Sequence, residues 1–199
     1  MIKTVSVLHG SLDFSFDMLE FLVSDLTQQQ ADWMPPGKAN PIGSLYWHII
    51  AYADQIIHEW CLPPMLEISM DDWFEAKKQN QNLKMGQTPL RITGEWEEKV
   101  ILSLHPENPE DPYWKVRTSR EGFRADLPAL HDYARATREF LQDWVLSQTP
   151  EDLERILPTP IGEYNLGDFL EIFIISHMNN HIGEISAIKG CQGLKGYPW

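Results

Sequence analysis

The segment NLGDFLEIFIISHMNNHIGEISAIKG, from Asn165 to Gly190, predicts the last long helix of an all-α fold. Asn165 is a typical N-cap residue, and a glycine just after Lys189 is a typical helix terminator. Apolar residues recur along the segment with helical spacing, yet His177 and His181 fall on the same apolar side. Titratable side chains in such a position have to bond another side chain, coordinate a metal ion or contact water, because burying them without a partner is unfavourable. The two histidines are therefore the first candidates for a functional site.

A carboxylate accompanies these histidines, since Glu184 falls on the same side of the helical wheel. One interpretation is structural: the imidazoles bond Tyr or Ser hydroxyls across the bundle, and an arginine such as Arg138 holds Glu184. The other is a metal site, because side chains at i and i+4 on a helix can converge on one ion. A pair of histidines does not distinguish the two interpretations, because the metal site needs a third ligand.

Helical periodicity predicts three more long helices upstream. The second of the four follows a loop with two prolines and a glycine, with Asn40 as its N-cap and Pro41 as its first residue. The third has Asp126 as its N-cap and Pro128 in its first turn. The four predicted helices cover residues 5–27, about 41–60, 126 to about 147, and 165–190.

The segment 61–125 between the second and third helices contains six prolines and shows no sustained periodicity. A bundle with only short loops is therefore excluded. We expect an all-α four-helix bundle with a long, partly irregular crossover between helices 2 and 3, formed by residues 1–199 as one domain. Within the crossover, a short helix over residues 71–79 and two short strands over residues 99–104 and 113–118 are the expected regular elements.

The composition excludes several classes of protein. The formal net charge of -13, with no concentrated basic patch, argues against binding to nucleic acid. No apolar run reaches the length needed to cross a bilayer, and the first residues lack a signal-peptide pattern. Two cysteines, Cys61 and Cys191, are too few for a disulfide framework, and we interpret them as incidental thiols. We therefore expect a cytoplasmic protein with neither membrane nor nucleic-acid partners.

The third ligand has to come from the other histidines of the chain. His48 lies on a polar stripe of the second predicted helix, away from that helix's apolar residues. Periodicity alone suggests a surface position, but the stripe could equally line a wet cleft between helices. The other residues of this stripe are Ser44, Tyr52, Gln55 and Glu59, and the remaining histidines are His9, His58, His105 and His131.

The chain resembles the DinB/YfiT-like superfamily of metal-dependent four-helix-bundle proteins. The resemblance rests on PIGSLYWHIIAYADQIIHEW (residues 41–60) and on SHMNNHIGEISAIKGCQGLKGYPW (residues 176–199), in which H-x3-H-I-G-E leads into a glycine-containing tail. It spans most of the chain except the crossover. It implies that His48, His177 and His181 are the three ligands of a divalent metal, with zinc or nickel first and iron, manganese or copper as alternatives.

The same resemblance implies an activity on a small-molecule substrate. The first hypothesis is a metal-dependent, S-transferase-like enzyme that activates a low-molecular-weight thiol; the alternatives are a metal-dependent hydrolase and a non-catalytic, stress-related binding protein. Three neutral imidazoles would leave coordination positions open, as in catalytic sites. Glu184 is expected to orient a ligand histidine, to act as a general base or to form an internal ion pair, and Asn180 to bond an imidazole. Similar proteins frequently form homodimers, so we expect one here.

Overall fold

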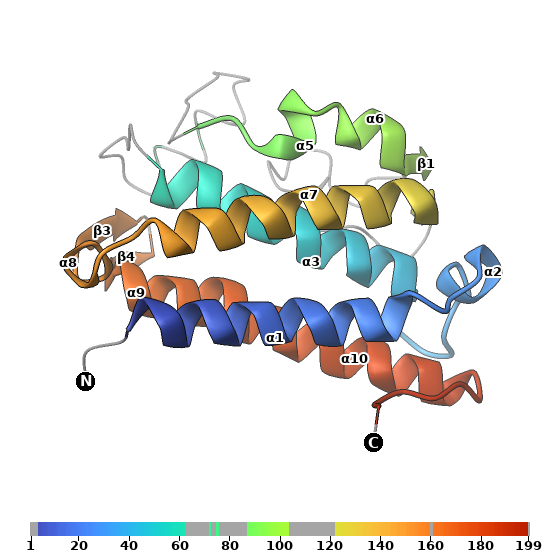
Figure 1. Ribbon diagram of the computed structural model, residues 1–199. Helices are drawn as coiled ribbons and strands as arrows, with labels where there is room; N and C mark the ends of the chain where they lie inside the picture. The colour runs from blue at the N-terminus through green and yellow to red at the C-terminus, as the bar shows by residue number, and fades with distance from the viewer. Residues whose placement is uncertain are drawn as a thin grey trace.

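The computed structural model describes residues 4–62, 87–103, 122–159 and 161–198, together with Asp72 and Glu75. It confirms the all-α class, because long helical segments dominate the described residues (Figure 1). Two of these segments include a π-helical stretch, η1 or η2. The segments are α1 (Val5–Val23), α3 (Ile42–Ile56) with η1 (Ile57–Cys61), α7 (Leu127–Leu146), and α9 (Leu166–Leu170) with η2 (Glu171–Ser176) and α10 (His177–Cys191).

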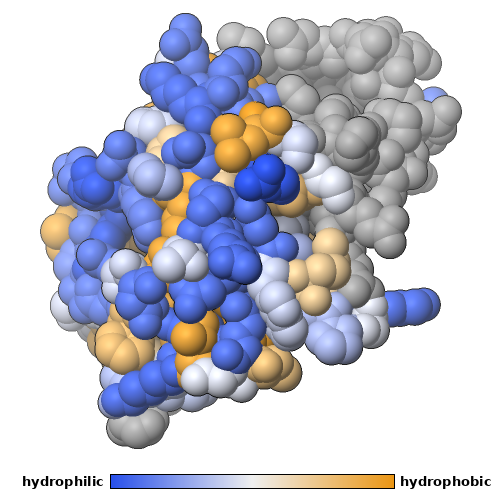
Figure 2. Space-filling model, turned by 90° about the vertical axis from the view of Figure 1, so that its right-hand side faces the viewer, coloured by the Kyte–Doolittle hydropathy of each residue, from blue (hydrophilic) through white to orange (hydrophobic). Residues whose placement is uncertain are grey.

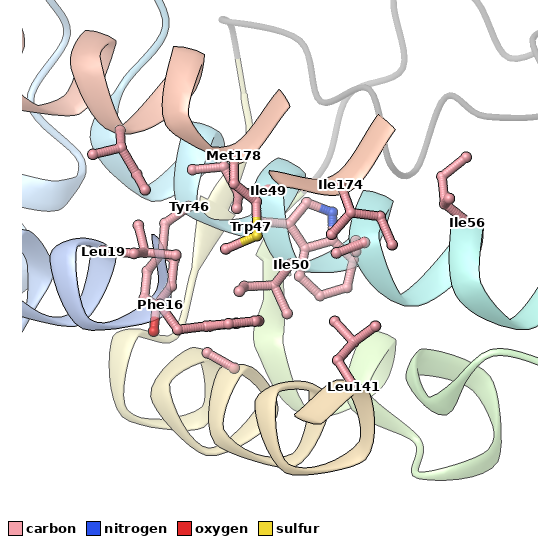
Figure 3. Close-up of a cluster of buried hydrophobic side chains, with 14 of the residues drawn as sticks. Phe16, Leu19, Tyr46, Trp47, Ile49, Ile50, Ile56, Leu141, Ile174 and Met178 are labelled. Carbon is pink, nitrogen blue, oxygen red and sulfur yellow. The ribbon is translucent and has the colours of Figure 1, made fainter. Parts of the chain in front are cut away.

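The long segments pack side by side around one hydrophobic core. α1 contacts α7 and α10, and α3 contacts the same two helices. In Figure 3, Phe16 of α1, Ile50 of α3, Leu141 of α7 and Met178 of α10 point toward one another, and all are buried. Each such side chain stabilises the fold by about 1.5–3 kcal/mol. The core therefore fixes α3 next to α10, the two helices that carry the candidate histidines.

Two of the predicted helix starts are confirmed by their caps. The Asp126 carboxylate accepts from the backbone N–H of Ala129, with Pro128 in the first turn of α7. The Asn165 side chain likewise accepts from the N–H of Asp168 at the start of α9. The structure thus bears out the N-cap residues of the third and fourth predicted helices.

The first two helices differ from the prediction at one end each. α1 ends at Val23 rather than at residue 27, because Thr27 caps a separate short helix, α2 (Gln28–Ala31), and exchanges hydrogen bonds with Gln30. In α3 the predicted N-cap is wrong: Pro41 occupies the cap position without a side-chain hydrogen bond, and the helix begins at Ile42. Asn40 instead lines a pocket.

The last helix is not the single α-helix that the wheel assumed. On a continuous wheel of about 100° per residue, the buried residues of α9 and those of α10 would point about 100° apart. A π-helical turn holds one residue more than an α-helical turn, so η2 supplies this offset and lets both stripes face the core. Phe173, which a single α-helical wheel would place on the same side as the histidines, is accordingly only half-buried.

The described part of the crossover contains two short helices and one pair of strands. Of the predicted strand over residues 99–104, β1 (Ile101–Ser103) is present and pairs antiparallel with β2 (Arg124–Ala125), which the sequence did not predict. The predicted strand over residues 113–118 lies outside the described residues. The predicted helix over residues 71–79 does too, except for Asp72 and Glu75. The two short helices are α5 (Leu90–Thr93) and α6 (Trp96–Val100).

A buried carboxylate anchors this crossover to the bundle. Asp54 of α3 is fully buried and accepts hydrogen bonds from the backbone N–H groups of Leu90 (2.9 Å) and Arg91 (2.8 Å) at the start of α5. The hydroxyl of Tyr133 on α7 donates a third bond of 2.6 Å to it. Asp54 thereby joins α3, α5 and α7 at one point.

A short helix and a hairpin connect α7 to the last helical segment. They are α8 (Pro150–Leu153) and the antiparallel pair β3 (Ile156–Thr159) and β4 (Gly162–Asn165). The hairpin was not predicted. Its second strand ends at the N-cap of α9, so it sets the direction in which that helix enters the bundle.

The surface agrees with the acidic composition. On the side of the molecule at the α2 end, the described residues are mainly hydrophilic, and hydrophobic ones appear in small separate groups (Figure 2). Among the helices formed by described residues, none combines the length and apolar character that a membrane span requires.

Candidate metal centre

Three histidines from two neighbouring helices converge on one point. His48 lies in the middle of α3, His177 is the first residue of α10, and His181 follows one turn later. The Nε2 atom of His177 is 3.2 Å from Nε2 of His48 and 3.2 Å from Nε2 of His181. One nitrogen from each ring lies within 4.8 Å of the others. The structure therefore brings together the three histidines that the resemblance singled out.

The cluster is half-buried and forms one wall of a pocket of about 390 Å³. Ser44 and Tyr52, on the polar stripe of α3, line the same pocket. Gln55 and Glu59, further along the stripe, are buried, and the Gln55 amide donates to the Glu59 carboxylate. The stripe therefore does not face open water, and the suggestion from periodicity that His48 is a surface residue is wrong.

The contact of His181 with Glu184 assigns a proton to one nitrogen of this imidazole. Nδ1 of His181 is 2.6 Å from Oε2 of Glu184. An ionised carboxylate only accepts hydrogen bonds, so Nδ1 carries a proton, and in the neutral form of the ring Nε2 presents its lone pair to the cluster. The structural alternative, in which Arg138 holds Glu184, is wrong. The guanidinium of Arg138 instead bonds three carboxylates of α1, those of Asp13, Asp17 and Glu20.

His177 has the most perturbed environment of the three. Burial, and then the neighbouring His48 and His181, lower the pKa of His177 from 6.5 to about 3. Its Nδ1 atom is buried without a hydrogen-bond partner among the described residues. His177 is therefore neutral at physiological pH, which is the form of imidazole that binds a metal ion.

The nitrogen atoms fit a divalent ion that prefers nitrogen ligands. Two nitrogens that each lie about 2.0–2.1 Å from a tetrahedral zinc ion are about 3.3 Å apart. The two Nε2–Nε2 distances of 3.2 Å are close to this value. A hydrogen bond across either 3.2 Å contact needs a proton on one of the two nitrogens, whereas a cation would use the lone pairs of all three. The donor set suits zinc, nickel, iron or copper, so it does not select one metal.

The other candidate ligands lie elsewhere. His58 is buried beside Asp54, with Nδ1 2.9 Å from the Asp54 backbone oxygen, and stacks on Phe140. Nδ1 of His131 is 3.2 Å from the hydroxyl of Tyr46. His9 and His131 both line a larger cavity, of about 840 Å³, that contains none of the three clustered histidines, and His105 lies outside the described residues. Chemistry rather than cavity size therefore identifies the candidate site.

The structure also shows where Asn180 and the two cysteines lie. Asn180 is exposed, and among the described residues it shares no hydrogen bond with an imidazole. Burial raises the pKa of the Cys61 thiol well above its ordinary value, which makes it a poor nucleophile. Cys191 is an exposed free thiol at the end of α10. Neither cysteine lines the pocket, whereas Asn40 and Leu45 do, which the sequence did not indicate.

An all-α bundle with three converging imidazoles beside an open pocket defines a class of candidate metalloproteins. A family model for the DinB superfamily matches residues 11–185, and the chain belongs to that superfamily. No curated protein matches the sequence significantly. The fold is similar to that of a conserved protein from Enterococcus faecalis, known from a crystal structure. The two share 15% identity over 96% of this chain and 99% of that chain, with a TM-score of 0.56.

Proposed function

We propose that the protein is a metal-dependent enzyme whose His48, His177 and His181 hold one divalent ion. The observation that carries the proposal is the convergence of three Nε2 atoms, with 3.2 Å from His177 to each of the others. A divalent ion at this point would supply a Lewis acid, which favours deprotonation of a thiol or of water at neutral pH. The half-buried pocket beside the cluster leaves room for a small-molecule substrate.

The residues at this site have different proposed roles. The three imidazoles bind, and Glu184 holds the proton of His181 on Nδ1, so that Nε2 stays free to coordinate. Because Glu184 keeps this contact in the free protein, positioning is the role that we assign to it, ahead of general base. Asn40, Ser44 and Tyr52 line the pocket and offer polar atoms that would orient a substrate.

We propose attack of a small thiol on an electrophilic carbon as the reaction: the thiol loses its proton, its sulfur forms a bond to the carbon, and the displaced group leaves with the electron pair of the broken bond and takes up a proton. Two considerations support it. The chain resembles a superfamily that includes enzymes using low-molecular-weight thiols, and neither cysteine of the chain lines the pocket. A thiol nucleophile would therefore have to come from a small molecule, and a neutral pocket wall beside an ion of 2+ charge would favour its thiolate form.

A thermal-shift screen on metal-loaded protein tests this proposal. A ligand of the native state raises the melting temperature by mass action, so small thiols should raise it and matched alcohols should not. The triple variant His48→Ala, His177→Ala, His181→Ala serves as the control and should show no thiol-dependent shift. Turnover of an activated ester without any thiol would favour a hydrolase instead. Metal binding with neither a thiol effect nor turnover would favour a non-catalytic binding protein.

A further inference from the structure

The imidazoles of His181 and His177 are held by different kinds of contact. Nδ1 of His181 lies 2.6 Å from the Glu184 carboxylate, which fixes the rotation of that ring. Nδ1 of His177 is buried and has no hydrogen-bond partner among the described residues. Histidines that bind metals nearly always donate the N–H of their second nitrogen to a carboxylate, a carbonyl or water, and this contact orients the ring. His177 therefore needs another restraint to keep Nε2 directed at the cluster.

Tyr52 makes the contact that is suited to this purpose. It lies one turn after His48 on α3, is half-buried and lines the pocket. Its ring is stacked on the imidazole of His177, with 4.1 Å between ring centroids and 28° between ring planes. The centroid of His48 lies 5.7 Å from the same tyrosine ring. If the His177 ring rotated out of its present plane, it would lose its stacking contact with the Tyr52 ring.

We propose that Tyr52 is a positioning residue, which fixes the plane of His177 by ring stacking in place of the hydrogen bond that Nδ1 of this imidazole lacks. The inference rests on the proposed metal site and adds a residue to it. Stacking needs the aromatic ring and not the hydroxyl, so Phe at position 52 should serve as well as Tyr. A flexible aliphatic side chain should not, even where it fills much of the same volume.

Titration with Co²⁺ of wild-type protein, Tyr52→Phe, Tyr52→Met and Tyr52→Leu tests the inference. The readouts are the dissociation constant for Co²⁺ and its visible absorption spectrum, which depends on ligand geometry. Wild type and Tyr52→Phe should agree in both. The Met and Leu variants should bind about tenfold or more weakly, with a changed spectrum. Tyr164→Leu is the matched control: Tyr164 is also half-buried, but its ring contacts Phe169 and Phe173 instead, so both readouts should stay unchanged.

The possible outcomes separate this inference from the proposed function. If wild-type protein binds no Co²⁺, the proposal of a metal site is wrong, and so is the proposed role of Tyr52. If wild type binds Co²⁺ and the Met and Leu variants match it in affinity and spectrum, the site stands and stacking is not needed. An equal loss in Tyr52→Phe would assign the effect to the hydroxyl and overturn the inference. Far-UV circular dichroism confirms folding of each variant, and Tyr52→Met, which keeps most of the volume, decides if Tyr52→Leu does not fold.

Discussion

At the scale of single residues, the candidate site depends on which nitrogen of each imidazole carries a proton. The contact between Glu184 and Nδ1 of His181 assigns a proton to this nitrogen, and it involves a carboxylate that is 55% exposed. The sequence placed Glu184 beside the histidines, because residues three apart on a helix are neighbours. It left three roles open for Glu184, since helical spacing does not specify which partner a carboxylate chooses.

Removal of the Glu184 carboxylate should weaken metal binding without unfolding the protein. The variant Glu184→Ala frees Nδ1 of His181, so the ring loses its orientation and its preferred tautomer. We expect a loss of about 10–100-fold in metal affinity, measured by competition with a chelating dye. Glu163→Gln, which changes an exposed carboxylate on β4, should have no effect. An unchanged affinity in Glu184→Ala would show that this contact does not support the site.

The depressed pKa of His177 predicts how the metal-free protein responds to acid. In the folded protein this pKa is about 3, whereas in the unfolded chain it is near its ordinary value of 6.5. Between these two values the unfolded state binds more protons, so the free energy of unfolding should fall as the pH drops from about 6.5 toward 3. Urea denaturation at pH 7 and pH 5 in the presence of chelator measures this change.

The substitution His177→Phe removes the titrating group. The difference in unfolding free energy between pH 7 and pH 5 should therefore be smaller in this variant than in wild type. An equal difference in both proteins would mean that other groups cause the acid sensitivity.

At the scale of elements, the helix starts were predictable where a side chain caps the backbone, as Asp126 and Asn165 do. The π-helical segments were not, because no residue type marks an i to i+5 turn. The apolar pattern does change its phase between α9 and α10, and this change could have indicated η2. A single helical wheel drawn over the whole segment does not reveal it. No regular element was predicted between the third and fourth helices, so the β3–β4 hairpin was missed.

Deletion of one residue from η2 tests whether this π-helical segment sets the phase of the ligand helix. Ile172 lies in η2 and is 48% exposed, so its loss removes little core packing. Without it, a regular α-helical connection would join α9 and α10 in the relative rotation that they have now, because η2 holds one residue more than an α-helical turn. We expect this single deletion to keep metal binding, whereas the additional deletion of Glu171, which is also exposed, would rotate α10 by about 100° and abolish it.

The substitution Ile172→Ala is the control, because it keeps the length of the segment while shortening the same side chain. It should leave metal binding intact. Loss of metal binding in the single-deletion variant, or its retention in the double-deletion variant, would show that the segment does not set the phase of α10.

At the scale of the whole molecule, the crossover depends on one buried carboxylate. Asp54 joins α3, α5 and α7 through three hydrogen bonds and is fully buried. Asp54→Ala leaves two N–H groups and a hydroxyl without their acceptor, and should reduce the free energy of unfolding by about 3–5 kcal/mol. Asp143→Ala, at an exposed position of α7, is the control. A reduction below about 1 kcal/mol in Asp54→Ala, measured by urea denaturation, would contradict this anchoring role.

The completed site is also a property of the whole molecule. The sequence identified His177 and His181 from a four-residue spacing, but periodicity suggested the surface for His48. Only the packing of α3 against α10 turns its polar stripe toward the other two imidazoles. Helical spacing alone does not specify which helices become neighbours, so the third histidine was found through the family resemblance. Neither helical spacing nor the family resemblance predicted that Tyr52 packs on His177, which is again a contact between helices.

The most direct test of the metal site is elemental analysis of protein purified without a histidine tag. Wild type should contain about one divalent ion per chain, and the triple variant His48→Ala, His177→Ala, His181→Ala should contain none. His58→Gln and His131→Gln should keep the ion, because both histidines lie outside the cluster. Absence of metal from wild type, even after reloading with zinc, nickel and iron, would contradict the account, as would equal metal content in wild type and the triple variant.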